Sequence, residues 1–499
     1  MSKKVIIIGA GFSGLSAAAY LAAAGYDVHV HEKNSTAGGR ARQFRTPEGY
    51  LFDMGPSWYW MPDVFERFFN DFGKKASDFY SLQLLDPSYS IIFGKQDCMD
   101  IPADYEQLLK LFEQIESGSA IRLKEFLLEA EYKYKAGVED LVYKPAHSFL
   151  EFTDFKTLMG ISRMQVFSSF SKHVRKYFKH PKLIALMEFP VLFLGAMPQE
   201  TPALYSLMNY AGLKLGTWYP QGGFGKVAEG MRRVAEEHGA QFHFNSPVNK
   251  INVRANSIES IDTNSGSIEV DVVIGAADYN HIEQKLLNES DRGYSESYWE
   301  RKTFAPSSLI FYLGIKKRIE KLKHHNLFFD ADLDVHSAEI YKDKKWPTDP
   351  LFYVCCTSKS DDNVAPSGHE NLFVLMPLAA GLTDTSGNRE KYFAWIMKRI
   401  EAYTGEELVS HIDYRRDYCI DDFKSDYNAY KGNAYGLANT LMQTAFLKPK
   451  MKSKKLDNLY FAGQLTVPGP GVPPAIISGK VSAKEVIKNF SIKKHEISV

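Results

Sequence analysis

Three glycines near the start of the chain have the types and spacing to hold a dinucleotide. They follow the apolar run VIII at the spacing G-x-G-x-x-G, as Gly9, Gly11 and Gly14. In such a strand–turn–helix unit the first glycine permits a tight turn, the second lets backbone approach a pyrophosphate, and the third lets helix and strand pack closely. The alanine-rich segment 13–24 predicts the helix, whose N-terminus would face the phosphates.

An acidic residue ends the second predicted strand, DVHVHE. Glu32 lies about 20 residues beyond Gly14, where a carboxylate accepts hydrogen bonds from ribose hydroxyls and disfavours a 2′-phosphate. NADP is therefore disfavoured. The pair Gly38 and Gly39 gives a second close backbone approach, and Arg40 can contact phosphate oxygens. This second motif resembles that of the FAD-containing amine oxidase and desaturase superfamily, and the resemblance implies FAD rather than NAD.

The bulk composition narrows the possible partners. The chain has 60 Lys+Arg and 60 Asp+Glu, so its formal net charge is zero, which argues against a nucleic-acid partner. Its 4 cysteines form no C-x-x-C pair, and we expect no metal site from them. No uninterrupted apolar stretch reaches about 18 residues, so we predict no membrane-spanning helix.

A chain of 499 residues is too long for one hydrophobic core. Apolar runs and glycine turns predict an α/β, Rossmann-type dinucleotide domain assembled from 1–80, 220–285 and 430–499. Residues 80–220 read as a helical insert, in which a basic, aromatic helix suits either a membrane surface or the core. Residues 285–430 read as a β-rich substrate domain.

Four longer stretches carry a family resemblance that covers nearly the whole chain. The first runs from VIIIGAGFSGL to TAGGRAR, and the others are FDMGPSWYWMP, YSLMNYAGLKLGTWYPQGGFGKV and NLYFAGQLTVPGPGVPPAIISGK. Together they resemble the bacterial phytoene desaturase family of carotenoid desaturases, within the FAD-dependent amine oxidase-like superfamily. An acidic residue often stands in the wider superfamily where this chain has Gln464, and its absence here matches the carotenoid branch better.

The resemblance implies FAD as the cofactor, no metal, and a long C40 polyene as the substrate. We place the substrate beside Trp58 and Trp60, for which core packing is the equal alternative. The cofactor residues that we expect are Gly9, Gly11, Phe12, Ser13, Gly14, Glu32, Lys33, Gly38, Gly39, Arg40, Gly55, Pro56, Ser57, Val248, Gly463, Gln464, Val472 and Pro473.

The implied activity is phytoene desaturation, stepwise from phytoene to lycopene. It proceeds by hydride transfer to the flavin with loss of a proton from the neighbouring carbon. The family implies a peripheral protein of the cytoplasmic membrane, with oxygen or a quinone as electron acceptor. We assign no catalytic base. His147, Asp154, Arg163 and Arg175 could assist, but each reads more readily as a surface residue.

Other functions stay open. The nearest is a carotenoid desaturase acting at the 3,4-position of a hydroxylated or monocyclic carotenoid. A carotene cis–trans isomerase needs reduced FAD but makes no net oxidation, and motifs do not separate it from a desaturase. An amine oxidase-like enzyme fits less well. A non-enzymatic prenyl-protein binder would need no flavin, and the intact glycines and Glu32 speak against it.

Overall fold

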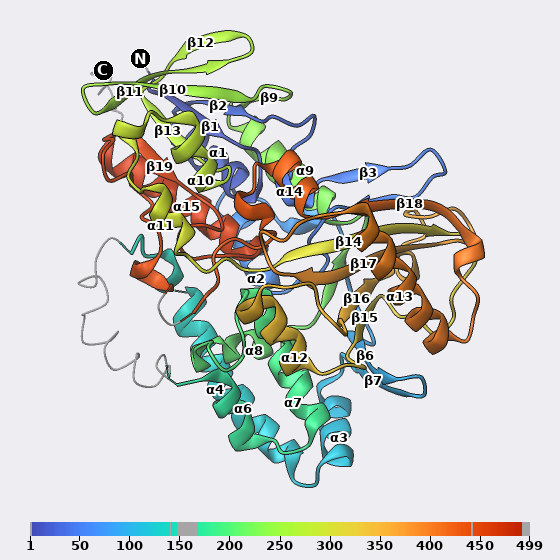
Figure 1. Cartoon of the computed structure of the whole chain (residues 1–499). Coiled ribbons are helices and arrows are strands. Elements are labelled where there is room, and N and C mark those ends of the chain that lie inside the picture. The colour runs from blue at the N-terminus through green and yellow to red at the C-terminus, as the bar shows by residue number, and fades with distance from the viewer. Residues whose placement is uncertain (1, 140, 147–164, 166–167, 441–442, 492–499) are drawn as a thin grey trace.

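The computed structural model describes residues 2–139, 141–146, 165, 168–440 and 443–491 (Figure 1). A five-stranded parallel sheet carries the predicted glycine motif at its centre. Its central strands are apolar on both faces because both faces are covered. Helices pack on one face, and the apolar side chains of residues 248–261 pack on the other. In spatial order they are β19 (Leu459–Phe461), β13 (Val272–Gly275), β1 (Lys4–Ile8), β2 (Asp27–His31) and β9 (Gln241–His243).

Small residues bring three helices close to this sheet and to one another. At Gly479 an added Cβ would lie 2.2 Å from the Ser13 carbonyl oxygen, so only glycine permits the contact between first and last helix. Ser16 Oγ donates to the Ile476 carbonyl at 2.7 Å in the same interface. The three helices are α1 (Phe12–Ala23), α9 (Phe224–Glu237) and α15 (Val472–Asn489).

A seven-stranded mixed sheet forms the second large unit. Alternate residues of its strands pack on α13 (Ser386–Thr404), while the other set turns toward the molecular centre, as the two-residue period of a strand requires. In order, the strands are β18 (Ile412–Tyr418), β14 (Ser307–Ile315), β17 (Glu370–Leu378), β16 (Phe352–Cys355), β15 (His325–Phe328), β6 (Tyr89–Gly94) and β7 (Asp97–Ile101).

Part of the segment 80–220, which we predicted as a helical insert, joins this sheet. Strands β6 and β7 lie inside the predicted helical insert 80–220, yet β6 pairs in parallel with β15. The segment therefore contributes two strands to the substrate sheet before it turns helical. Short strands also join distant segments: β3 (Gln43–Arg45) with β4 (Leu51–Asp53), β5 (Leu82–Leu84) with β8 (Trp218–Pro220), and β10 (Val248–Arg254) with β11 (Ser257–Thr263) and β12 (Gly266–Glu269).

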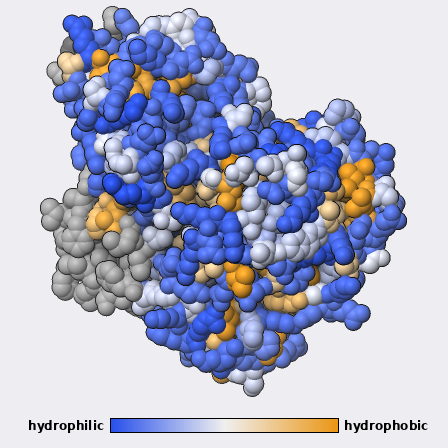
Figure 2. Space-filling view, in the orientation of Figure 1, coloured by the Kyte–Doolittle hydropathy of each residue, from blue (hydrophilic) through white to orange (hydrophobic). Residues whose placement is uncertain are grey.

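The helical layer lies below both sheets in Figure 1. The aromatic side of α6 packs into the core, with Phe170, Val174 and Phe178 fully buried, so this face is not a membrane surface. Figure 2 shows a mostly hydrophilic face broken by separate apolar patches. The layer comprises α3 (Tyr105–Ile115), α4 (Ser119–Glu139), α6 (Phe170–Tyr177), α7 (Pro181–Glu188) and α8 (Leu207–Leu213).

In the part of the chain that the structure describes, no helix is long and apolar enough to cross a membrane. The remaining helices connect the units: α2 (Pro62–Asn70), α10 (Tyr279–His281), α11 (Glu296–Glu300), α12 (Leu333–Ala338) and α14 (Ile420–Tyr427).

Candidate functional site

One cavity of about 450 Å³ runs from the parallel sheet to the inner face of the mixed sheet. Its glycine-rich half is lined from the first 57 residues and from 276–281, 426–435 and 462–475. Its apolar half lies against β15, β16 and β17. The side chains that line the apolar half include Trp58, Trp60, Met61, Phe189, Met208, Leu327, Phe329, Leu351, Phe352, Tyr353, Leu375 and Pro377.

The cofactor residues expected from the sequence gather along the glycine-rich half. Gly14 differs from the rest, because it packs behind the wall: a Cβ there would lie 2.0 Å from the Gly9 carbonyl oxygen. The others line the cavity directly: Gly9, Gly11, Phe12, Ser13, Glu32, Lys33, Gly38, Gly39, Arg40, Gly55, Pro56, Ser57, Val248, Gly463, Gln464, Val472 and Pro473.

The two glycine motifs touch each other. A Cβ on Gly39 would lie 3.0 Å from the Gly11 Cα, and Gly38 donates its N–H to the Ala10 carbonyl at 2.8 Å. Gly38 has φ 112°, in the left-handed region where glycine is favoured. A Cβ on Gly11 meets nothing closer than 3.9 Å and would project into the cavity. The space beside Gly11 is therefore shaped for a ligand.

Glu32 accepts hydrogen bonds from the two loops beside it. One carboxylate oxygen accepts from the Ala10 N–H at 2.8 Å, and the other accepts from the N–H and the side-chain amide of Asn34, both at 2.8 Å. The side chain is buried at the cavity wall. Its remaining lone pairs are available to ribose hydroxyls. Nearby, Lys33 Nζ donates to the Ser425 carbonyl and holds the last turn of α14 at this end of the cavity.

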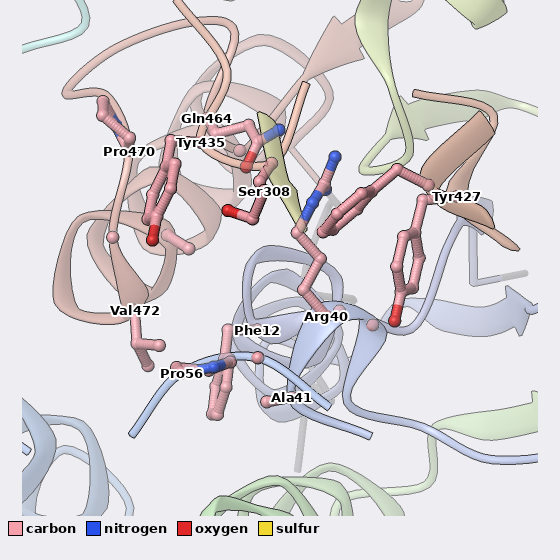
Figure 3. A pocket seen from close by; sticks show the side chains of 18 of the residues that line it. Phe12, Arg40, Ala41, Pro56, Ser308, Tyr427, Tyr435, Gln464, Pro470 and Val472 are labelled. Atoms are coloured by element: carbon pink, nitrogen blue, oxygen red, sulfur yellow. The ribbon is translucent and has the colours of Figure 1, made fainter. Parts of the chain in front are cut away.

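Arg40 lies in the wall with unused hydrogen-bonding capacity. One terminal nitrogen donates to the Asn433 carbonyl at 3.2 Å, the amide oxygen of Gln464 accepts at 3.0 Å, and the Tyr427 ring lies 5.1 Å away. Among the described residues its Nε has no partner. Burial lowers the pKa of Arg40, opposed by the charge of Asp278. Figure 3 shows the arginine rising beside Tyr427 at the cavity.

Asp53 holds the segment that precedes Gly55 against helix α9. Its carboxylate accepts from the N–H groups of Phe224 and Gly225, at 3.0 and 3.3 Å, and so caps α9. Burial raises the pKa of Asp53 to about 7. The next residues of the segment, Gly55 and Pro56, do line the cavity.

The family model of the flavin containing amine oxidoreductases matches residues 12–487 of this sequence. The chain belongs to this family. A carotenoid 3,4-desaturase of Haloarcula japonica is 41% identical over 98% of this chain and 98% of its own. A zeta-carotene-forming phytoene desaturase of Myxococcus xanthus is 29% identical over 97% and 94%. An oxidoreductase structure from Methanosarcina mazei matches with TM-score 0.62 and 15% identity over 97% of this chain and 100% of its own.

Within that family the chain groups with the carotenoid desaturases, and it is an FAD-dependent oxidoreductase. The α/β fold with a parallel dinucleotide-binding sheet is thereby confirmed. The cavity fits FAD: the space beside Gly11 suits a pyrophosphate, Glu32 suits a ribose, and the partnerless Nε of Arg40 suits an anionic or carbonyl group. Bound FAD supplies the oxidant, as a hydride acceptor.

The C-terminal helix begins at the same cavity. Helix α15 starts at Val472, and Pro473 and Pro474 occupy its first turn, where a missing N–H costs nothing. These two prolines donate no hydrogen bond, so its effect on a ligand is that of the helix dipole, which favours negative charge. Gly463, at the end of β19, completes the wall beside Ser13.

Trp58 and Trp60 lie where the glycine-rich half meets the apolar half. Both line the cavity, and their rings meet edge to face with centroids 5.3 Å apart. Trp60 Nε1 donates to Thr217 Oγ1 at 2.8 Å, which fixes the indole. Trp58 stacks on the buried His325 at 4.2 Å. Both tryptophans therefore form part of the cavity wall. This position agrees with contact to a substrate and with core packing alike.

Most residues that line the apolar half were not predicted from the sequence. Leu375 and Pro377 face the cavity from β17, between residues that turn to the opposite core. Tyr353, on β16, places its hydroxyl 2.9 Å from Ser57 Oγ. Strand periodicity signals an inward face, but not which cavity it lines. Of the four assisting residues, His147, Asp154 and Arg163 lie outside the described residues, and Arg175 pairs with Glu188 away from the cavity.

Proposed function

We propose that the protein is a carotenoid desaturase that introduces a double bond at the 3,4-position of a long carotenoid. The observation that carries this proposal is the 41% identity, over nearly the full length of both chains, to the carotenoid 3,4-desaturase. Sequence identity to the phytoene desaturase of Myxococcus xanthus is lower, at 29%. The proposal thus favours the 3,4-desaturase that we held as an alternative over phytoene desaturation.

The cavity supports a long apolar substrate. Its apolar half is walled by aromatic and aliphatic side chains from the mixed sheet and the helical layer, and it opens directly onto the glycine-rich half. Apolar walls exclude water and orient a chain that offers few polar groups. A reacting C–C bond would therefore lie at the junction near Ser57 and Trp58.

Hydroxyl groups at this junction support a substrate with a polar end. Ser57, Ser308, Tyr353 and Tyr435 all line the cavity, and Figure 3 shows Ser308 and Tyr435 close to Gln464. The 3,4-bond lies near the end of a carotenoid, so a terminal hydroxyl would lie within a few bonds of the reacting carbons. We propose a hydroxylated carotenoid as the substrate for this reason.

Access to such a substrate requires a lipid surface, and we propose peripheral docking on the cytoplasmic membrane. Ile121 and Leu128 lie two turns apart on α4 with exposed fractions of 66% and 67%, which supports α4 as the docking face. Oxygen or a membrane quinone would reoxidise the flavin. Flotation with liposomes tests the docking: Ile121→Glu with Leu128→Glu should release the protein, while Val409→Glu, on a different exposed segment, should not.

Two substrates separate the two desaturase functions. The FAD-loaded protein is incubated under air with liposomes that contain either phytoene or an acyclic carotenoid with a terminal hydroxyl and a saturated 3,4-bond. The products are separated by HPLC with absorbance and mass detection. The proposal expects the hydroxylated carotenoid to lose two hydrogens and phytoene to stay unchanged. Conversion of phytoene to lycopene would instead identify a phytoene desaturase, and an isomer of unchanged mass would identify an isomerase.

A further inference from the structure

A chain of hydrogen-bonding groups leads from the cavity into the mixed sheet. Ser57 Oγ and the Tyr353 hydroxyl lie 2.9 Å apart at the cavity wall. The Tyr353 hydroxyl lies 2.6 Å from Nδ1 of His325, which is fully buried behind the wall and stacked on Trp58. Burial holds the pKa of His325 well below its usual value, so its ring is neutral. Tyr353 therefore donates to His325, and Ser57 to Tyr353.

Further polar groups lie beyond His325, between its ring and solvent. The ring of His324 lies 4.4 Å from that of His325. Their Nε2 atoms form no hydrogen bond with each other or with any other described residue, so a proton passes between them only through a bridging water molecule. His324 Nδ1 bonds to Ser360 Oγ at 2.9 Å. Ser360 is half-buried and reaches solvent. The nearby Asp361 carboxylate raises the pKa of His324, against a larger lowering by burial, and so offsets a positive charge there.

A dehydrogenation reaction needs a group that accepts the substrate proton, and this series of hydrogen-bonding groups suits that role. One carbon loses a hydride, with its electron pair, to the bound flavin. The neighbouring carbon loses a proton, and the C–H electron pair left behind becomes the second bond of the new alkene. Among the described residues that line the cavity, the carboxylates are Glu32, Asp278 and Asp426, all in the glycine-rich half. The apolar half thus needs another proton acceptor, and water is excluded from it.

His336 is the histidine that lines the apolar half among the described residues, and both of its ring nitrogens have partners. Nδ1 accepts from the Leu351 N–H at 2.9 Å, and Nε2 lies 3.3 Å from the Pro377 carbonyl. Tyr353 differs, because it lines the cavity and its hydroxyl already lies 2.6 Å from Nδ1 of the neutral His325. A carbon next to a carbocation is a strong acid, so a weak neutral base suffices to accept its proton.

We propose that Ser57, Tyr353, His325, His324 and Ser360 form a proton relay that removes the substrate proton from the cavity to solvent. This inference rests on the proposed desaturase function. The proton is accepted at the Tyr353 oxygen as the phenol proton moves to His325 Nδ1. The Nε2 proton of His325 passes through a bridging water molecule to Nε2 of His324, and Nδ1 of His324 releases a proton through Ser360 Oγ. Charge and proton number balance at every step.

The same groups raise the question of a metal ion. A ring nitrogen of His324, one of His325 and the sulfur of Cys355 lie within 4.8 Å of one another. Burial raises the pKa of the Cys355 thiol to about 12, so this donor set is uncharged. A dication without a paired anion is costly in such surroundings. A proton that passes through is the better fit to these groups.

The chain offers a matched control for the phenol. Tyr50 is fully buried, and its hydroxyl lies 2.7 Å from Nδ1 of His369, but neither residue lines the cavity. Tyr50→Phe and Tyr353→Phe therefore delete the same atom from the same type of bond. His325→Gln adds a second comparison, because an amide still accepts from Tyr353 yet carries no proton from one ring nitrogen to another.

The experiment follows flavin bleaching in anaerobic single turnovers of the FAD-loaded full chain with the hydroxylated carotenoid, or with phytoene if that is what it converts, in H₂O and D₂O. FAD affinity and zinc content are measured for every variant. We expect Tyr353→Phe and His325→Gln to slow bleaching by about 100-fold or more, within the range of lost acid–base catalysis. We also expect both variants to lose a wild-type solvent isotope effect, while Tyr50→Phe matches the wild type and FAD affinity is unchanged.

Three results would overturn the relay. Bleaching in Tyr353→Phe as fast as in Tyr50→Phe would remove the phenol from the chemistry. Wild-type rates in His325→Gln would leave His325 a positioning role only. One equivalent of zinc that is lost in Cys355→Ser would show that a metal holds the nitrogens. By contrast, no wild-type bleaching with either carotenoid would contradict the proposed function itself.

Discussion

The two halves of the cavity are built in different ways. The glycine-rich half is made of backbone and short loops, and its positions are fixed by atoms that leave no room for a side chain, as at Gly14 and Gly39. The apolar half is made of side chains from strands and helices far apart in sequence, including β17 and α8. Gly14 and Gly39 therefore leave no room for a larger residue, whereas we expect the second half to accept side chains of different shape. A cofactor held in common and a substrate that varies would need this division.

Substitution at the second motif glycine separates cofactor binding from folding most sharply. In Gly11→Val the side chain would enter the space assigned to the pyrophosphate, while its Cβ meets no described atom within 3.9 Å. We expect a folded protein that has lost FAD binding by at least about 100-fold, or about 2.7 kcal/mol. Flavin absorbance after gel filtration and the thermal unfolding midpoint of the apoprotein measure the two effects.

Gly14→Ala is the matched control, because its Cβ would lie 2.0 Å from the Gly9 carbonyl oxygen. It should lower the unfolding midpoint even without FAD. If Gly11→Val keeps its flavin absorbance, the pyrophosphate does not lie beside Gly11.

Filling the apolar half should spare the cofactor. Leu375 faces the cavity from β17, and Leu375→Trp would occupy part of the substrate volume. We expect carotenoid turnover to fall by at least about 10-fold, since it takes about 1.4 kcal/mol of lost substrate binding to produce that change. FAD affinity should stay at the wild-type value. A parallel loss of FAD would show that the two halves are not independent.

The glycine-rich half was largely predictable and the apolar half was not. Gly9, Gly11 and Glu32 act through local geometry that a short motif encodes, and all three line the cavity. Tyr353 and Leu375 reach the cavity only because β16 and β17 pair within one sheet, which no local pattern encodes. No local pattern encodes the place of β6 in this sheet either, because its partner β15 lies more than 200 residues away.

A smaller effect is expected at the ribose carboxylate. Glu32→Ala removes acceptors for Ala10 and Asn34 as well as for the ribose. We expect FAD binding to weaken by about 1–3 kcal/mol, the cost of leaving hydrogen-bonding groups unpaired. Titration with FAD gives the affinity. Glu32→Gln keeps one acceptor and should fall between the alanine variant and the wild type, and an unchanged affinity in both would place the ribose elsewhere.

The smallest effect that we predict is a dependence of the unfolding midpoint on pH. Buried neutral histidines have lowered pKa values, so they stabilise the fold above about pH 6.5, and that contribution is lost as pH falls toward about 4. Asp53 acts in the opposite sense, because its raised pKa makes its contribution fall as pH rises through about 7. The histidines are more numerous, so we expect the unfolding midpoint to drop between pH 7 and 5. They are His31, His173, His281, His324 and His336.

Thermal unfolding of the apoprotein across this range measures the effect. His336→Gln should flatten the dependence, because it removes one of these groups. A midpoint that rises on acidification would show that Asp53 and Glu283, whose pKa burial also raises to about 7, dominate instead.

The strand order β19-β13-β1-β2-β9 has a consequence for biosynthesis. Strand β1 is translated well before its neighbour β13, and β13 pairs in turn with β19, which is translated later still. The dinucleotide-binding sheet is therefore incomplete until β19 has been translated. Such long-range pairing slows folding and leaves apolar strand edges open to aggregation in the nascent protein. We expect cofactor supply and chaperone capacity to govern the yield of soluble enzyme.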